Sequence, residues 1–493
     1  MHAVTRAAGA AVRAGARAQS TAVAPAAGAA GQASFMESML FDAPRQNSLD
    51  ETFPGVPAIS GELAAPTKVQ VSKLPNGLTV VSQDSHRGAS TVGVYLKGGS
   101  RTETVPGTAF AAQQLAFKST QKRSALKLFR DVDVVGGALS AVAGRETLAY
   151  TASGTRDCLS LLTEAVAETL TAPKLDAWEL DENAAWTAAQ LAAAQAAPGA
   201  AIAQAVHAAA FGEASPLGKA PATAGQAGVE DVKAYLSAHV QGKNAVLAGV
   251  NVDHAQLVEA GDLLLLGVPE GAPAKFEAVK PRGGEFITRT DAGVTEVGLG
   301  FAVTGLDAKA TLALQVLQAA LGTAPPPGLT RGSAKTQISD LLAKIKAGDT
   351  ALPSGSTVSS GVYTYSDAAL FTLTGATAGQ ATGIWLDTVV ALLKEVAGGK
   401  LTDAEVNNAK KVATLKAVGA VDGIHGLSAD MGAQLALTGK YQGAAEQAAA
   451  FAGVKTADVA AAAKSVLAGT VGLAATGNAA ALPRYDALLT SLL

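Results

Sequence analysis

Few side chains of this 493-residue chain could bind a metal ion or act as nucleophiles, and they are scattered along it. There are six histidines and one cysteine, Cys158. No histidines stand in an HxxEH or HExxH spacing, which would place two imidazoles on one face of a helix for zinc. A single thiol forms neither a paired-cysteine metal site nor an internal disulfide. We therefore expect Cys158 to be a small buried residue.

The histidines fit structural positions better than metal sites. His207 lies in QAVHAAAF, an apolar helical stretch, and is expected to be a packed, hydrogen-bonded histidine of a core or interface. His239 and His254 flank a predicted strand and are expected at the surface. None of the three has a second ligand at a metal-binding spacing.

Other motifs of catalysis are missing from the sequence as well. There is no GxxxxGK[ST] phosphate loop, no GxSxG nucleophile turn, and no GxGxxG after a predicted strand. The net charge of −3 shows no excess of basic residues, such as the basic face that nucleic-acid binding requires. We expect no nucleic-acid partner and no bound cofactor.

The stretch GTAFAAQQLAFKST, residues 107–120, is expected to be a helix that follows a glycine-rich turn. Strands should surround it. Asn76-Gly77 in LPNGLTVVSQD is a strong hairpin signal between two β-type runs. The segment 134–154, VVGGALSAVAGRETLAYTASG, predicts a second strand pair around Gly144. The helix therefore lies between two pairs of strands.

The sequence also contains an internal repeat. STVGVYLKGGS at 90–100 resembles TEVGLGFAVTG at 295–305, and NAVLAGVNVD resembles VGLAATGNAA later in the chain. The matches occur in the same order, which indicates two copies of a unit of about 210 residues. We predict an α+β fold with two homologous domains, 67–268 and 285–493, joined by a Pro- and Gly-rich linker at 269–284. Each domain should be a mixed, mostly antiparallel sheet with helices packed on one face.

Two further segments lie before the first domain. Residues 1–35 contain Arg6, Arg13 and Arg17 but no acidic residue, which is typical of an organellar transit peptide. Residues 36–66 are rich in proline and are expected to form an extended arm, which we expect to lie over a partner subunit. A charge-free run, 183–212, could pack inside a domain or against a partner.

Taken in order, these segments resemble the pitrilysin-type family of metallopeptidases, which includes the mitochondrial processing peptidase and the core proteins of the cytochrome bc1 complex. The resemblance covers residues 67–493 and implies a peptidase-like fold of the LuxS and processing-peptidase type. Active members carry an HxxEH zinc motif in the helix after the glycine turn. The resemblance implies that Phe110 and Gln114 replace the two histidines and that Gln113 replaces the catalytic glutamate.

The resemblance also places a further zinc-binding acid near residues 190–193. Gln190 and Ala193 stand there, with Leu191 and Ala192 between them. A phenyl ring and amides replace the imidazoles and the general base, so no metal site and no catalytic residue are expected in this chain.

Several stretches, including GSRTETVPGT and YSDAALFTLTGATAG, are most similar to the core proteins of complex III. This resemblance implies a structural subunit on the matrix side of the mitochondrial inner membrane, without peptidase activity. Its expected partners are core protein 1, a subunit like the processing-peptidase beta subunit, and the cytochrome b, cytochrome c1 and Rieske iron-sulfur subunits. The whole complex would be a homodimeric assembly.

The non-catalytic alpha subunit of the processing peptidase is the alternative. That subunit recognises substrate through a long, flexible, glycine-rich loop in its second half. The corresponding segment here, LGTAPPPGLTRGSAKTQISD, has three consecutive prolines, which stiffen the backbone. An active metallopeptidase would need the ligands that are missing.

Overall fold

The computed structural model of the chain describes most residues after the predicted arm. The described ranges are 66–86, 88–196, 199–223, 227–290, 293–322, 336–347, 351–353 and 355–492. The predicted transit peptide, the arm up to residue 65 and the proline-containing segment 323–335 lie outside the described residues. Within the described ranges, no helix combines the length and apolar character needed to span a membrane.

The first sheet has six strands in the order β1-β2-β6-β3-β5-β4. Their bounds are β1 Gln70–Lys73, β2 Thr79–Gln83, β3 Ser90–Lys97, β4 Ala138–Ala143, β5 Thr147–Gly154 and β6 Ala245–Val250. The β1–β2 hairpin turns at the predicted Asn-Gly pair, where Gly77 has a φ of 84°. The predicted strand pair around Gly144 is confirmed as β4 and β5.

The second sheet has five strands in the order β7-β11-β8-β10-β9. Their bounds are β7 Gly284–Arg289, β8 Val294–Thr304, β9 Ser359–Thr364, β10 Ala368–Ala378 and β11 Thr470–Gly477. β2 and β6 pair in parallel, as do β7 and β11, and the other neighbours are antiparallel. The second order equals the first without β1, so the strands occupy the places that the internal repeat predicts, in mixed, mostly antiparallel sheets.

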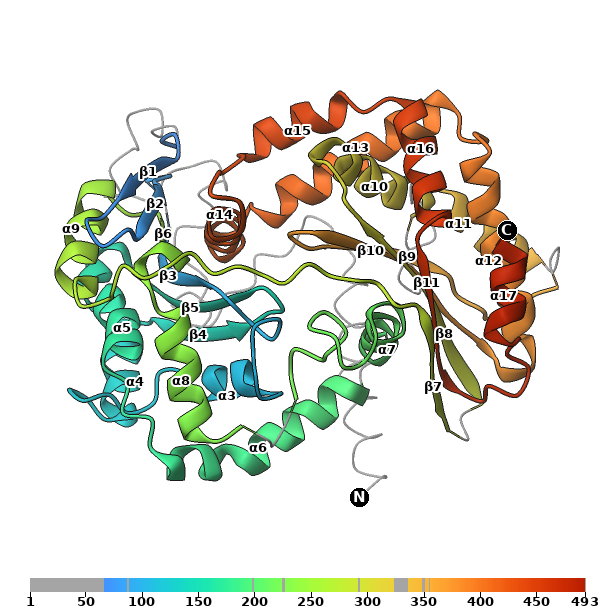
Figure 1. Ribbon diagram of the computed structural model, residues 1–493. Coiled ribbons are helices and arrows are strands. Elements are labelled where there is room, and N and C mark those ends of the chain that lie inside the picture. The colour runs from blue at the N-terminus through green and yellow to red at the C-terminus, as the bar shows by residue number, and fades with distance from the viewer. Residues whose placement is uncertain are drawn as a thin grey trace, which may run out of the picture. The chain divides into compact units, whose positions relative to one another are not determined.

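Helices cover each sheet (Figure 1). Before the linker they are α3 Thr108–Gln114, α4 Ala125–Asp133, α5 Leu159–Thr171, α6 Ala177–Ala196, α7 Ala200–Phe211, α8 Val229–His239 and α9 His254–Leu265. After it they are α10 Ala308–Leu321, α11 Gln337–Ala347, α12 Thr382–Ala397, α13 Asp403–Ala420, α14 Ile424–Thr438, α15 Ala444–Ala452, α16 Thr456–Leu467 and α17 Tyr485–Leu492.

Successive side chains of the central strands point to opposite faces of each sheet and so belong to different layers of the core. On β3, Val92, Val94 and Leu96 pack with α5 and α9 in one cluster, whereas Tyr95 belongs to a cluster on the other face. On β8, Val297 and its alternate neighbours pack with α10, α12 and α16. Successive side chains of a strand point to opposite faces, so each sheet has two covered faces.

The second face of each sheet is covered by a helix from the other half of the chain. α7 precedes the linker but packs on β7, β8 and β11 of the second sheet. α14 follows the linker but packs on β3 and β6 of the first sheet. The prediction of helices on one face of each sheet is therefore incomplete. One helix of each half, α7 or α14, packs on the second face of the sheet in the other half (Figure 1).

Glycines allow α7 to approach its sheet closely. A Cβ added at Gly298 or Gly300 would lie 2.5 or 2.4 Å from a Val206 methyl group. A Cβ at Gly472 would lie 2.5 Å from the backbone nitrogen of Ala210. These distances are far below van der Waals contact, so the helix and sheet can meet only where side chains are absent.

A buried ion cluster joins the two halves. The Arg101 guanidinium donates to both carboxylate oxygens of Asp367, at 2.9 and 2.7 Å, and to a Glu146 carboxylate oxygen. It also donates to the carbonyl of Glu277 at 2.6 Å and lies 4.8 Å from the ring centre of Phe276, both in the linker. The Arg101 side chain is 1% exposed, so one residue ties the first sheet, the linker and the β9–β10 turn together.

Candidate functional site

α3 is the helix that corresponds to the zinc-binding helix of active family members. Gly107 and Glu103 fix its start. Gly107 precedes it with a φ of 88°, and a Cβ there would lie 2.6 Å from the carbonyl oxygen of Thr223. The Glu103 carboxylate accepts from the backbone N–H groups of Gly107 and Ala109, at 3.1 and 3.2 Å. Burial raises the pKa of Glu103, and these hydrogen bonds partly offset that rise. Glu103 therefore acts as the helix cap.

One of the three predicted ligand and base positions forms a hydrogen bond to the first sheet. Phe110 is buried, and Gln113 and Gln114 are half-buried. The side-chain oxygen of Gln113 accepts a hydrogen bond from the backbone N–H of Ala143 at 2.8 Å. Ala143 is the last residue of the edge strand β4. An amide at this position thus connects α3 to the sheet.

The predicted positions of the further acid lie on α6. Gln190 and Ala193 are both exposed there, although α6 contacts α3. A phenyl group and three amides offer zinc none of the imidazole or carboxylate ligands that it prefers. Within the described part of the chain, no group of three His, Cys, Asp or Glu side chains is placed to hold a metal ion. The residues present at this site do not fit a zinc ion.

His207 is a buried, hydrogen-bonded histidine, as predicted. Its Nδ1 lies 2.7 Å from the carbonyl oxygen of Ala203, and its Nε2 lies 2.7 Å from the hydroxyl of Tyr365. Burial lowers the pKa of His207 to about 3, helped by the nearby Arg145 charge. The imidazole is therefore neutral, with Nδ1 donating to the carbonyl and Nε2 accepting from the tyrosine.

The surface prediction for His239 is wrong. Its ring is buried and lies 4.4 Å from that of Tyr235, centre to centre, because α8 packs this face against the end of β3. His254 is half-buried between the hydroxyls of Ser72 and Ser82, each 2.8 Å from a ring nitrogen. Cys158 is half-buried instead of buried, because it lies at the exposed start of α5.

The charge-free run has two different environments. Its second part, α7, is buried on the second sheet from Ala205 to Phe211. Its first part, on α6, is largely exposed, with Trp186 64% accessible. Internal packing therefore holds for α7, although on the sheet of the other half, and packing of α6 against a partner stays a prediction.

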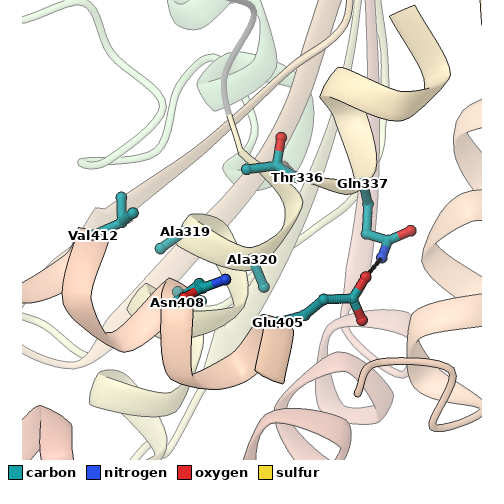
Figure 2. A pocket seen from close by; sticks show the side chains of 8 residues that line it. Ala319, Ala320, Thr336, Gln337, Glu405, Asn408 and Val412 are labelled. Carbon is teal, nitrogen blue, oxygen red and sulfur yellow. Dashed lines mark hydrogen bonds between the residues drawn. The ribbon is translucent and has the colours of Figure 1, made fainter. Parts of the chain in front are cut away.

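Two hollows lie in the second half. Figure 2 shows the smaller, about 10 Å³, where the Gln337 amide donates to Glu405 at 2.9 Å; it has room for about one water molecule. The larger has a volume of about 520 Å³ and lies among α10, β9 and α13 to α15. No motif pointed to it, because its lining residues come from separate elements and include no ligand-type spacing.

Two family models match consecutive parts of the chain. The model described as insulinase, peptidase family M16, matches residues 79–220. The model described as the peptidase M16 inactive domain matches residues 227–412. The two matches belong to one family and together include α3, α6 and most of both sheets.

Similar proteins extend over most of the chain. The mitochondrial cytochrome b-c1 complex subunit 2 of Rattus norvegicus is 29% identical over 86% of this chain and 93% of its own length. The mitochondrial-processing peptidase subunit alpha of Solanum tuberosum is 27% identical over 86% of this chain and 84% of its own.

A solved structure has the same fold. A chain of complex III2 from Candida albicans, solved with Inz-5 bound, matches with a TM-score of 0.75. The match covers 86% of this chain and 100% of that chain, at 19% sequence identity. At this identity, the likeness concerns the fold.

Proposed function

Because the chain belongs to the peptidase M16 family, we propose that it is a structural, non-catalytic member, core subunit 2 of the mitochondrial ubiquinol–cytochrome c reductase, complex III. It would pair with core protein 1 on the matrix side of the inner membrane and support assembly and stability of the complex. The proposed domains are residues 67–268 and 285–493, after a transit peptide at 1–35 and an arm at 36–66.

The observation that carries this proposal is the near full-length similarity to a complex III subunit 2. The match covers 93% of the rat protein. The substitutions at the zinc helix support the non-catalytic part. Phe110, Gln113 and Gln114 supply neither a zinc ligand of ordinary strength nor a group able to take a proton from water near neutral pH.

Native electrophoresis of mitochondrial extracts tests the proposal. The protein should migrate with a haem-containing complex that also contains cytochrome b, cytochrome c1, the Rieske protein and core protein 1. Migration as a soluble pair with a zinc-containing partner would contradict it and support the alternative, the alpha subunit of the processing peptidase. That alternative is supported by the 27% identity to the potato alpha subunit.

A gain-of-function variant tests the expectation that the further zinc-binding acid is missing. Phe110→His, Gln113→Glu and Gln114→His together rebuild HxxEH, but they leave no acid at Gln190 or Ala193. We expect less than one equivalent of zinc by metal analysis and no cleavage of a presequence peptide, because the coordination lacks its further ligand. One bound zinc with cleavage would show that another residue supplies the further ligand, and would contradict that expectation.

A further inference from the structure

The turn between β1 and β2 contains a pair of residues that can react with each other. Asparagine is followed by glycine once in the sequence, at Asn76-Gly77. In such a pair the glycine backbone nitrogen can attack the amide carbon of the asparagine side chain, because glycine has no Cβ to hinder the approach. Ammonia leaves as the succinimide ring closes, and water then opens the ring to aspartate or isoaspartate. This deamidation needs water and enough backbone freedom to close the ring.

The folded turn engages both reacting groups. The Gly77 N–H donates to the Leu74 carbonyl at 2.9 Å, so the attacking nitrogen is held within the turn. The side-chain oxygen of Asn76 accepts from the Leu78 N–H at 3.2 Å. Ring closure has to break both hydrogen bonds and turn the Asn76 amide carbon toward the Gly77 nitrogen. The closed hairpin should therefore resist deamidation.

The Asn76 amide also joins the hairpin to the end of α9. Its nitrogen donates to the carbonyls of Leu265 and Val268, at 2.9 and 3.4 Å. Leu265 is the last residue of α9, and the last carbonyls of a helix have no partner within it. An ionised carboxylate at position 76 would accept hydrogen bonds but donate none, and its charge would face the negative end of the helix dipole. A deamidated chain therefore cannot restore this contact.

The hairpin is placed to open without unfolding of the whole chain. β1 pairs only with β2 and forms one border of the first sheet. Three of its four residues are exposed, whereas β2 is mostly buried between β1 and β6. Segments with few buried apolar contacts open at a lower free energy than the core does. We therefore expect β1 and the turn to separate from β2 and α9 in local openings.

We propose that Asn76 is a modification site gated by the β1–β2 hairpin. Deamidation takes place while the hairpin is open, and the aspartate or isoaspartate that results prevents the turn from docking on α9 as before. Each opening adds to the modified fraction, so residue 76 records the total time that the hairpin has spent open. This role is independent of the proposed place in complex III.

Deamidation kinetics test the gate on the unaltered protein. The purified full chain and a synthetic peptide of residues 73–79 are incubated in the same neutral buffer, and mass spectrometry follows deamidation at residue 76. The folded chain should react at least about tenfold more slowly than the peptide, because only the open fraction reacts. In urea that unfolds the chain, the two rates should agree within about twofold.

The effect of low urea concentrations separates a local opening from global unfolding. The slope of a free energy against urea concentration scales with the surface that becomes exposed. Opening of one hairpin exposes little surface, so the logarithm of the deamidation rate should rise with less than about half the slope of global unfolding. Equal slopes would show that only the unfolded chain reacts, and would overturn the hairpin gate.

A variant that leaves Asn76 and Gly77 in place tests the same gate. The Ser72 hydroxyl on β1 lies 2.8 Å from Nε2 of His254 on α9. Ser72→Ala removes this hydrogen bond and should speed deamidation of the folded chain about two- to tenfold. Ser140→Ala, at an exposed position of the other border strand β4, should leave the rate unchanged. Equal rates for the two variants would contradict the gate.

The product is tested by Asn76→Asp, which carries the charge of the deamidated residue. It should unfold at a lower urea concentration than wild type, whereas Asn407→Asp, an equal change of charge at an exposed position of α13, should not. An unchanged midpoint for Asn76→Asp would overturn the proposed effect on docking. Equal deamidation of the folded chain and the peptide would overturn the proposal as a whole. That comparison uses the wild-type chain, so it stands even if Asn76→Asp fails to fold.

Discussion

Replacing Arg101 by methionine should loosen the connection between the two halves of the chain. Methionine fills a similar volume but donates no hydrogen bond. The variant removes the contacts to Asp367, Glu146 and the Glu277 carbonyl at once. It leaves the Glu146 carboxylate buried, with only the Ser366 N–H and hydroxyl as donors.

The expected loss is large because the cluster is buried. Removing one partner of a buried ion pair costs about 3–5 kcal/mol, since the other charge remains without compensation. Most of the effect should come from Glu146, which is 6% exposed, because Asp367 is 31% exposed and can be hydrated. Arg101→Met with Glu146→Gln removes the stranded charge and should recover about half of the loss.

Acid pH should reduce the difference between wild type and Arg101→Met. Burial alone would raise the pKa of Asp367, but hydrogen bonds from Arg101 and the Val279 N–H lower it below its ordinary value. A carboxyl whose folded pKa is lowered adds stability above its unfolded pKa of about 3.9, and this is lost as the pH falls through the folded pKa. The variant lacks the Arg101 contribution to Asp367, so the Asp367 part of the difference should shrink as the pH falls below about 4.

Urea unfolding at pH 7 measures the loss, and limited proteolysis of the linker reports the contact between halves. Lys309→Met is the matched control, since it removes an exposed ion pair with Asp458, which solvent screens, and should leave the unfolding midpoint nearly unchanged. Equal unfolding midpoints for Arg101→Met and Lys309→Met would refute the reasoning. So would a double variant that is no more stable than the single one.

Two further variants test the packing of α7. Gly472→Ala places a Cβ 2.5 Å from the backbone of α7 and should lower the free energy of unfolding by about 1–3 kcal/mol. The control Gly267→Ala, where a Cβ has no atom within 4 Å, should change the free energy of unfolding by less than about 0.5 kcal/mol. Equal urea midpoints for the two variants would contradict this packing. His207, with a folded pKa of about 3 against about 6.5 unfolded, adds stability above pH 6.5 that falls by about 1.4 kcal/mol per unit as the pH drops toward 3. His207→Gln should flatten that slope in pH-dependent unfolding and exposed His425→Gln should not, so a slope unchanged by His207→Gln would refute the assignment of a neutral buried imidazole.

Local patterns predicted the strands well. The Asn76-Gly77 pair and the run around Gly144 both gave the hairpins that the structure contains, because turn residues fix short-range pairing. The internal repeat predicted two copies of one unit, and the strand orders of the two sheets agree with it. Such signals depend on neighbouring residues, so they can be found without knowledge of the tertiary fold.

The partner of each helix could not be predicted. The apolar face of α7, with Ile202, Val206 and Phe211, would suit either sheet equally, since burial of apolar surface has no direction. Gly298 and Gly300 on β8 and Gly472 on β11 mark its position, but isolated glycines in a strand have several explanations. The exchange of helices between halves is therefore visible only in three dimensions.

At the candidate site, the sequence pointed to the positions on α3 but not to the contacts that they make. The hydrogen bond from Ala143 to Gln113 depends on where the end of β4 lies relative to α3. The burial of His239 depends on Tyr235, four residues earlier, packing against the end of β3.

The exchanged helices have a consequence for synthesis from the N-terminus. When α7 leaves the ribosome, none of the strands that it covers has been made, because β7 begins at Gly284 and β11 at Thr470. Until β11 is complete, the face with Val206 and Phe211 has no sheet to bury it, so it is exposed to aggregation. Nor can the first sheet bury Tyr95 before Met431 of α14 arrives. Neither half can therefore cover both faces of its sheet alone, and folding of the whole chain should be complete only when its last strand is in place.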